Sequence, residues 1–219
     1  MISKRPKISI VDYGVGNLYS LERAVRLFTD RVSVTEDATE ILKSDGVILP
    51  GVGSFEAGMK GIKLRGLFNT IIEFWKTGKP ILGICLGTQL LMSKGYEFGE
   101  FDGLDIIKGR VIKFPKLKNG FKIPHIGWNS VVLLGNKENS VFVNNVRDPI
   151  FYFVHSYIFE PDDKKNIFAK TEYGGHRFCS IIKTANNVYG GNVYGCQFHP
   201  EKSGEAGLKL IENFINLAK

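Results

Sequence analysis

The sequence predicts an α/β fold: a mostly parallel central sheet with helices on both faces and an added antiparallel β layer. Two patterns carry this prediction. In the first half, apolar runs of strand length alternate with longer segments of helical period, which is typical of a parallel sheet covered by helices. From residue 104 onward, short β-rich segments follow one another with turn residues between them and hardly any helix. The 219 residues, 43% hydrophobic and 23% charged, indicate a single globular domain over 1–219.

The first half supplies the parallel strands and most of the helices. Residues 7–11 form an apolar run of strand length, and an apolar stripe at helical spacing follows over 18–28. Asn17 directly precedes this stripe and is a suitable N-cap. Further strands are expected at 32–35, 46–49 and 80–84, and helices at 67–76 and 85–92.

The second half supplies the remaining strands and a final helix. Apolar residues on one helical face recur over 208–218, and Ser203 stands where it can cap that helix. The β-rich segments before it are expected to extend the sheet and to add the antiparallel layer. They lie at 110–114, 129–133, 150–154, 167–171, 178–184 and 193–198.

Composition excludes several classes of function. The net charge is +7, but the dense run of lysines between 113 and 122 lies in a predicted solvated loop, so we expect no nucleic-acid partner. No eighteen apolar residues run together, so no membrane role is indicated. Three cysteines at irregular spacing favour the reducing cytoplasm over a disulfide framework. Cys196 and His199 lack a second ligand pair, so we expect no metal, and no cofactor is indicated.

One expected strand leads straight into a cysteine. The segment GICLG, residues 83–87, has Cys85 at its centre and glycines two residues to either side, and the predicted helix 85–92 follows. This pattern is typical of a nucleophile elbow with sulfur in place of a hydroxyl. Glycines permit a tight turn, and a helix N-terminus stabilises a thiolate. By itself, the segment is equally compatible with a buried structural cysteine.

A histidine and a glutamate stand close together near the end of the chain. The segment FHPE, residues 198–201, places His199 two residues before Glu201. In an extended chain these positions face the same side, so Glu201 can accept a hydrogen bond from one imidazole nitrogen while the other faces Cys85. Alone, the pair is also compatible with a solvated strand end.

A glycine-rich loop, PGVGSF at 50–55, follows the expected strand 46–49. In a parallel sheet this loop opens at the same carboxyl edge as the elbow. Its amides can help to form an oxyanion hole for a tetrahedral acyl intermediate, although a plain turn is the alternative. The expected donors are the N–H groups of Gly51, Val52, Gly53 and Leu86.

Together these segments resemble a known family. PGVG at 50–53, GICLGTQ at 83–89 and FHPEKS at 198–203 closely resemble the class I, triad-type glutamine amidotransferases. Within that class, DYGVGNL at 12–18, PHIGWN at 124–129 and YFVHSY at 152–157 look like the glutaminase subunits of imidazole glycerol phosphate synthase. The matching segments span residues 12 to 203, nearly the whole chain.

The resemblance implies roles for individual residues. Cys85 would attack the side-chain amide of L-glutamine, His199 would move the protons, and Glu201 would orient His199. Gln89 and Glu97 would line the glutamine pocket, with Glu97 against the α-ammonium group. Backbone groups of His155, Ser156 and Tyr157 would meet the α-carboxylate.

The resemblance also implies a partner. Ammonia would travel to a (β/α)8-barrel synthase subunit that forms imidazole glycerol phosphate and an aminoimidazole carboxamide ribotide, in a heterodimer of histidine biosynthesis. Three alternatives remain: a glutaminase subunit feeding another barrel synthase, for example in cell-surface sugar modification; a cysteine hydrolase of γ-glutamyl or peptide bonds; and a catalytically silent binding partner. The expected interface residues are Pro124, Trp128, Asn129 and Lys202.

Overall fold

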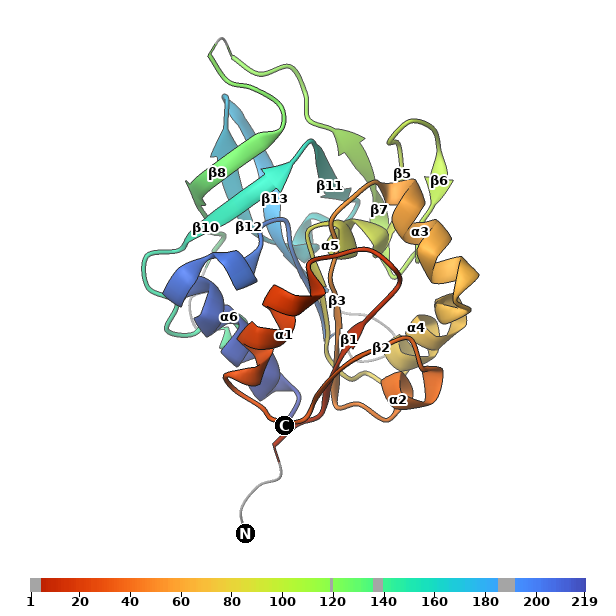
Figure 1. The fold of residues 1–219 in the computed structure, drawn as a ribbon. Helices are drawn as coiled ribbons and strands as arrows, with labels where there is room; N and C mark the ends of the chain where they lie inside the picture. The colour runs from red at the N-terminus through yellow and green to blue at the C-terminus, as the bar shows by residue number, and fades with distance from the viewer. Residues whose placement is uncertain (1–4, 119, 136–139, 185–191) are drawn as a thin grey trace.

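A large mixed sheet forms the centre of the molecule (Figure 1). The computed structural model describes residues 5–118, 120–135, 140–184 and 192–219. Within this part of the chain, the strand order is β2-β1-β3-β4-β14-β13-β12-β9, parallel from β2 to β14 and antiparallel from β14 to β9. Its strands are β1 (Ile8–Val11), β2 (Val32–Thr35), β3 (Gly46–Leu49), β4 (Ile81–Ile84), β9 (Val132–Leu133), β12 (Ile167–Tyr173), β13 (His176–Lys183) and β14 (Val193–Cys196).

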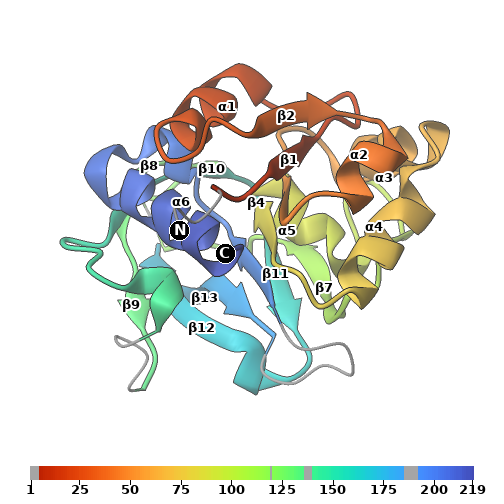
Figure 2. The ribbon, with the colours of Figure 1, turned by 90° about the horizontal axis from the view of Figure 1, so that it is seen from below.

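Helices cover both faces of this sheet, as Figure 2 shows for α6 on one side and α4 on the other. Residues of α1 and α6 share one apolar core, and residues of α2 to α5 share a second. The alternation along β4 explains this division, since Leu82 and Ile84 enter the first core and Ile81 enters the second. The helices are α1 (Leu18–Arg26), α2 (Ala38–Leu42), α3 (Phe55–Leu64), α4 (Leu67–Lys76), α5 (Leu86–Leu90) and α6 (Gly204–Leu217).

Two smaller sheets stand at the end of the molecule opposite the C-terminus (Figure 1). One is the antiparallel pair of β8 (His125–Ser130) and β10 (Ile150–His155). The other has the order β11-β7-β5-β6. Its strands are β5 (Met92–Gly95), β6 (Phe101–Asp102), β7 (Ile107–Lys113) and β11 (Tyr157–Pro161), and short 3-10 turns lie at Val141–Val143, Lys164–Asn166 and Pro200–Lys202.

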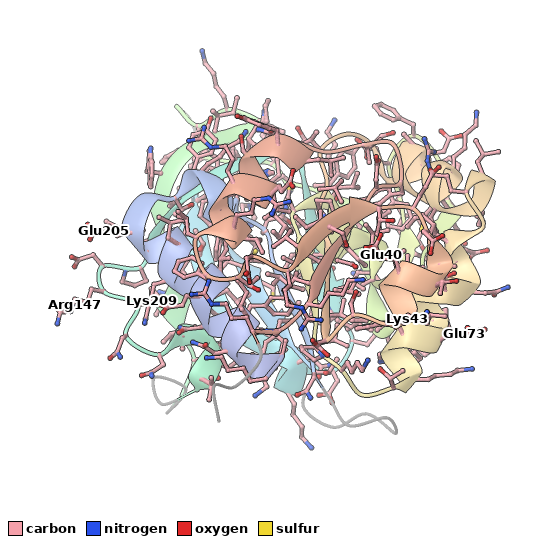
Figure 3. All side chains as sticks on the ribbon, turned by 60° about the horizontal axis from the view of Figure 1, so that its bottom comes forward. Glu40, Lys43, Glu73, Arg147, Glu205 and Lys209 are labelled. Atoms are coloured by element: carbon pink, nitrogen blue, oxygen red, sulfur yellow. The ribbon has the colours of Figure 1, made fainter. Side chains whose placement is uncertain are left out.

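The outer faces of the helices carry charge. Figure 3 shows Glu73 on the outside of α4 near Lys43, and Glu205 and Lys209 on α6. None of the helices in the described residues combines the length and apolar character that a membrane crossing requires. The predicted fold class, with its parallel sheet, flanking helices and antiparallel layer, is confirmed.

Several expected elements differ in the structure. The predicted helix 85–92 ends at Leu90, and Met92 begins β5. The sequence did not reveal this change because a short apolar run is compatible with a buried helix and with a buried strand. The predicted strand 129–133 is split: β8 pairs with β10 and β9 pairs with β12. Ser203 stands at the N-cap position of α6 as predicted, but its hydroxyl makes no capping bond, since it donates to the His199 carbonyl at 2.6 Å and accepts from the Tyr152 N–H at 3.0 Å.

The helix α3 was missed because glycines interrupt its apolar pattern. Ser54 caps it by accepting from the Ala57 N–H, and it then buries one apolar face. Gly61 lies so close to β1 and its following turn that an added Cβ would be 2.1 Å from the Tyr13 carbonyl oxygen. The glycine therefore weakens the helical signal in the sequence but allows the packing that stabilises the helix.

Candidate active site

The site forms where three neighbouring strands end. β4 lies between β3 and β14, and all three are parallel. Their carboxyl ends therefore lie at one edge of the sheet, where the loop 50–53, the turn at Cys85 and the segment 197–201 follow them. The prediction that the glycine-rich loop opens beside the elbow is confirmed by the pairing of β3 with β4.

Cys85 itself takes the strained backbone conformation of the elbow. Its φ is 51° and its ψ is −108°, between the end of β4 and the start of α5, and its N–H donates to the Cys196 carbonyl at 2.8 Å. Such a conformation is costly for a non-glycine residue and presents the side chain at the tip of a sharp turn. The flanking glycines supply space: an added Cβ would be 2.6 Å from the Thr88 Cα at Gly83 and 1.8 Å from the Leu49 oxygen at Gly87.

His199 and Glu201 form a buried pair. The imidazole Nδ1 lies 2.8 Å from Glu201 Oε1, and the two side chains are 2% and 4% exposed. The His199 N–H donates to the Tyr152 carbonyl at 2.9 Å, which attaches this segment to β10. The predicted pairing is present, but the predicted extended conformation is wrong, because Pro200–Lys202 form a 3-10 turn that brings the carboxylate back to the ring.

The charges around His199 favour its protonated form. Burial by itself lowers the pKa of His199, but its interactions with Cys85 and with the Glu201 carboxylate raise it to about 10. Since Glu201 occupies Nδ1, Nε2 is the nitrogen available to sulfur, and within the described residues it is buried without a hydrogen-bond partner. The arrangement therefore favours an imidazolium at His199 that interacts with the Cys85 side chain.

The glycine-rich loop packs directly on the first turn of α5. A Cβ added to Gly51 would be 2.7 Å from Leu86 Cβ and 3.0 Å from the Gly87 nitrogen. The buried Tyr13 hydroxyl anchors the loop by donating to the Pro50 carbonyl. Because the first N–H groups of a helix have no acceptor within it, that of Leu86 is available to a ligand here. The oxyanion-hole assignment of Gly51, Val52, Gly53 and Leu86 stays a prediction.

A pocket of about 300 Å³ opens in front of Cys85. Glu97 is held at the pocket wall because it accepts a hydrogen bond from the Phe55 N–H at 2.8 Å. Burial of the Tyr157 hydroxyl raises its pKa, and the nearby Glu97 carboxylate raises it further. Gln89 donates to the Tyr157 carbonyl at 3.1 Å. The lining includes every residue expected to bind glutamine, and it is formed by Val52, Gly53, Cys85, Leu86, Gln89, Glu97, Pro124, Val154, His155, Ser156 and Tyr157.

Known proteins share this sequence and fold. Residues 9–217 match the family described as "Glutamine amidotransferase class-I". The chain is 43% identical over 218 residues to imidazole glycerol phosphate synthase subunit HisH 1 of Legionella pneumophila (strain Paris), with 96% of this chain and 99% of the relative covered. It is 45% identical over 213 residues to the HisH 1 subunit of Methanococcus maripaludis, with 96% and 99% covered. The chain belongs to the HisH family of class I glutamine amidotransferases.

Membership in this family makes the chain an enzyme that hydrolyses glutamine. A solved structure described as PurLQS from Thermotoga maritima has the same fold, with a TM-score of 0.69 at 20% identity over 98% of this chain and 100% of that chain. The recognition of a class I glutamine amidotransferase from three short motifs is thus confirmed, and so is the narrower resemblance to HisH subunits.

One polar residue of this glutamine amidotransferase site escaped the sequence analysis. Gln197 is fully buried, and its side-chain amide donates to Cys85 Sγ at 3.6 Å while its Oε1 accepts from Gln89 at 3.3 Å. The available signal was a glutamine inside an otherwise apolar expected strand, two residues before His199. A buried amide needs partners, so this position already indicated a polar neighbour.

The residues expected at a partner interface are not gathered at one point. Trp128 on β8 is 58% exposed, and Lys202 reaches the same surface, where both flank the Tyr152 ring at 6.0 and 5.9 Å. Pro124 lines the same pocket as Cys85. Asn129 is half-buried and donates to the Glu172 carbonyl at 2.9 Å. These positions extend from the pocket across β8, and their interface role stays a prediction.

Proposed function

We propose that the chain, as one glutamine amidotransferase domain, is the glutaminase subunit of imidazole glycerol phosphate synthase. It hydrolyses L-glutamine to glutamate and passes ammonia to a (β/α)8-barrel synthase subunit, which forms imidazole glycerol phosphate and an aminoimidazole carboxamide ribotide. The observation that carries the hydrolysis is the strained Cys85, whose side chain interacts with the buried pair of His199 and Glu201. The acceptor rests on the relatives, which are named as HisH subunits of that synthase.

The first half of the reaction transfers the glutamyl group to sulfur. The Cys85 thiolate attacks the carboxamide carbon, and the N–H of Leu86 with the amides of loop 51–53 stabilises the negative oxygen that forms. His199 then gives its Nε2 proton to the nitrogen of the leaving group, the C–N bond breaks, and ammonia departs. A glutamyl thioester remains on Cys85, and Glu201 holds His199 in position throughout.

The second half restores the thiolate. Neutral His199 removes a proton from water, and the resulting hydroxide oxygen attacks the thioester carbon. The C–S bond breaks, glutamate leaves, and the thiolate again faces an imidazolium. Removal of one oxyanion donor from such a site costs about 3 to 4 kcal/mol of transition-state stabilisation, so the position of loop 51–53 is expected to affect the reaction rate strongly.

The pocket distinguishes the two ends of glutamine. Glu97 supplies a carboxylate for the α-ammonium group, and the segment from His155 to Tyr157 supplies backbone groups for the α-carboxylate. Gln89 lies one helical turn after Cys85 and stiffens this wall through its bond to the Tyr157 carbonyl. A substrate that lacks the α-amino group is therefore expected to bind more weakly.

Docking of the barrel subunit is assigned to the surface around β8. Trp128 and its neighbour Ile126, 58% and 59% exposed, form an apolar patch suited to a partner. Pro124 connects this surface to the pocket, and Asn129 and Lys202 supply polar contacts at its margin. We place the heterodimer in the cytoplasm, which the three cysteines support because none of them forms a disulfide.

The decisive experiment combines labelling with a coupled assay. A glutamine-analogue electrophile should label the wild-type chain and the buried-cysteine variant Cys179→Ala, but not Cys85→Ala. The chain should then copurify with the imidazole-forming barrel subunit and support glutamine-dependent cyclisation. Labelling with activity on a different barrel synthase would refute the acceptor, and hydrolysis of γ-glutamyl peptides in preference to glutamine would refute the amidotransferase reaction.

A further inference from the structure

The side chains of two buried histidines beside the pocket have no part in the reaction proposed above. His125 on β8 lies opposite His155 at the end of β10, in register across the antiparallel pair. Their rings are joined by a bond of 3.1 Å from His125 Nδ1 to His155 Nε2, and the residues are 2% and 6% exposed. His155 lines the pocket, so this bond leads from the pocket wall into β8.

The partners of the two rings determine where each proton lies. The Tyr157 carbonyl can only accept, so His155 Nδ1, 2.9 Å away, must carry a hydrogen. In a neutral ring His155 Nε2 is then an acceptor, and His125 Nδ1 must be its donor. His125 Nε2 is in turn an acceptor and faces the Asn129 amide nitrogen at 3.5 Å.

The orientation of the Asn129 amide is fixed independently. Its Oδ1 accepts from the Ser130 N–H at 2.8 Å, and its Nδ2 donates to the Glu172 carbonyl at 2.9 Å. Both rings are neutral at physiological pH, since burial lowers the pKa of His125 to about 4, and burial together with His125 lowers that of His155 to about 3. All donors therefore point one way, from Asn129 through the two histidines to the Tyr157 carbonyl.

Packing holds this chain of hydrogen bonds in place. The His125 ring is stacked on Tyr173 at 3.9 Å and on Phe153 at 4.8 Å between ring centroids. At the other end, the Tyr157 carbonyl also accepts from Gln89. Two donors from different elements thus orient one backbone carbonyl in the pocket wall.

We infer that His125 is a positioning residue for glutamine binding: its Nδ1–H holds His155, and through His155 it fixes the segment 155–157 against which the substrate lies. This inference rests on the proposed function. His125 touches neither the nucleophile nor the pocket interior, so its loss should weaken glutamine binding while the reactivity of Cys85 stays unchanged.

The test separates the donor of His125 from its ring. H125F keeps an aromatic ring between Tyr173 and Phe153 but has no donor, whereas H125N keeps an N–H at the position of Nδ1 without the ring. In the complex with the barrel subunit, H125F should raise KM for glutamine roughly 5- to 150-fold, the range for leaving one buried acceptor unpaired. The value of kcat should change much less, and H125N should lie closer to wild type.

A second measurement distinguishes the loss of this hydrogen bond from a general disturbance of the active site. The rate of Cys85 alkylation by iodoacetamide, which does not use the pocket wall, should be the same in wild type, H125F and H125N. If H125F does not fold, H125Q replaces it, because its amide occupies the Nε2 position and it too lacks the Nδ1 donor.

Equal KM values in all variants would overturn the inference, as would an equal rise in H125F and H125N, which would assign the effect to ring packing. A fall in kcat at constant KM would also overturn it. A wild-type complex that does not hydrolyse glutamine would instead refute the proposed function.

Discussion

Replacement of Glu201 by glutamine tests the electrostatics of the site most directly. The carboxylate lies 2.8 Å from His199 Nδ1, and both side chains are almost fully buried. A hydrogen bond to a charged group contributes about 1.5 to 3 kcal/mol, whereas the neutral bond that glutamine can retain contributes about 1 kcal/mol. The variant Glu201→Gln should therefore lose about 1 to 2 kcal/mol of imidazolium stabilisation, and kcat for glutamine should fall roughly 5- to 30-fold.

The same loss predicts a shift in pH dependence. Interactions with Cys85 and Glu201 raise the pKa of His199 to about 10, so the imidazolium of the wild type persists across neutral pH. A loss of about 1.4 kcal/mol corresponds to about one pKa unit, which moves the loss of the imidazolium to lower pH. Because a raised histidine pKa stabilises the fold fully below the unfolded value of about 6.5, the stability deficit of Glu201→Gln should be largest there and vanish above pH 10.

Two measurements check this prediction. One is the pH profile of Cys85 alkylation by iodoacetamide, and the other is thermal unfolding at acidic, neutral and strongly alkaline pH. Glu73→Gln is the control, since it removes an exposed carboxylate on the outside of α4 and should leave both unchanged (Figure 3). A Glu201→Gln profile that coincides with wild type, or a stability deficit that grows as pH rises, would refute the reasoning.

Three further predictions follow from contacts of the site. Gly51→Ala would place a Cβ 2.7 Å from Leu86 Cβ, so calorimetry should show about 1 to 3 kcal/mol of destabilisation with loss of activity, and an unchanged stability would contradict the packing. Gln197→Met keeps an extended side chain but removes the donor to Cys85 Sγ, so alkylation at neutral pH should slow roughly tenfold; a wild-type rate would exclude this contact as a thiolate donor. Burial lowers the pKa of His155 to about 3, so between about pH 3 and pH 6.5 this side chain binds a proton only in the unfolded chain. Urea unfolding should therefore require less denaturant at pH 4.5 than at pH 7, and this difference must shrink in His155→Asn.

Local patterns predicted the parallel half of the fold because its elements follow from short-range periodicity. β2, β3 and α4 begin and end at the predicted residues, and Asn17 caps α1 as expected. The elements that were missed or divided depend on distant partners. The segment 129–133, for example, reads as one apolar strand, but β8 and β9 pair with strands of different sheets.

The elbow at Cys85 and the contact between His199 and Glu201 were predictable because each lies in a short segment of distinctive composition, and a parallel sheet places the ends of its strands at one edge. Sequence reasoning nevertheless assigned the wrong local conformation to Glu201, since an i, i+2 relation is satisfied by an extended strand and also by the 3-10 turn that Pro200 opens. The need of the imidazole for a carboxylate partner thus predicted the contact between the two side chains, but not the backbone conformation that brings them together.

The contacts of Gln197 and His125 could not be predicted from the sequence. Each is an isolated polar residue whose role depends on a neighbour more than 25 positions away: Gln197 contacts Cys85 because β14 lies next to β4, and His125 contacts His155 because β8 pairs with β10 in one particular register. A shift of that register by one residue would turn the His125 ring to the other face of the strand and break the bond to His155. The segments expected to carry the chemistry were therefore recognisable on their own, whereas the contacts of Gln197 and His125 became recognisable only once the pairing of the strands was known.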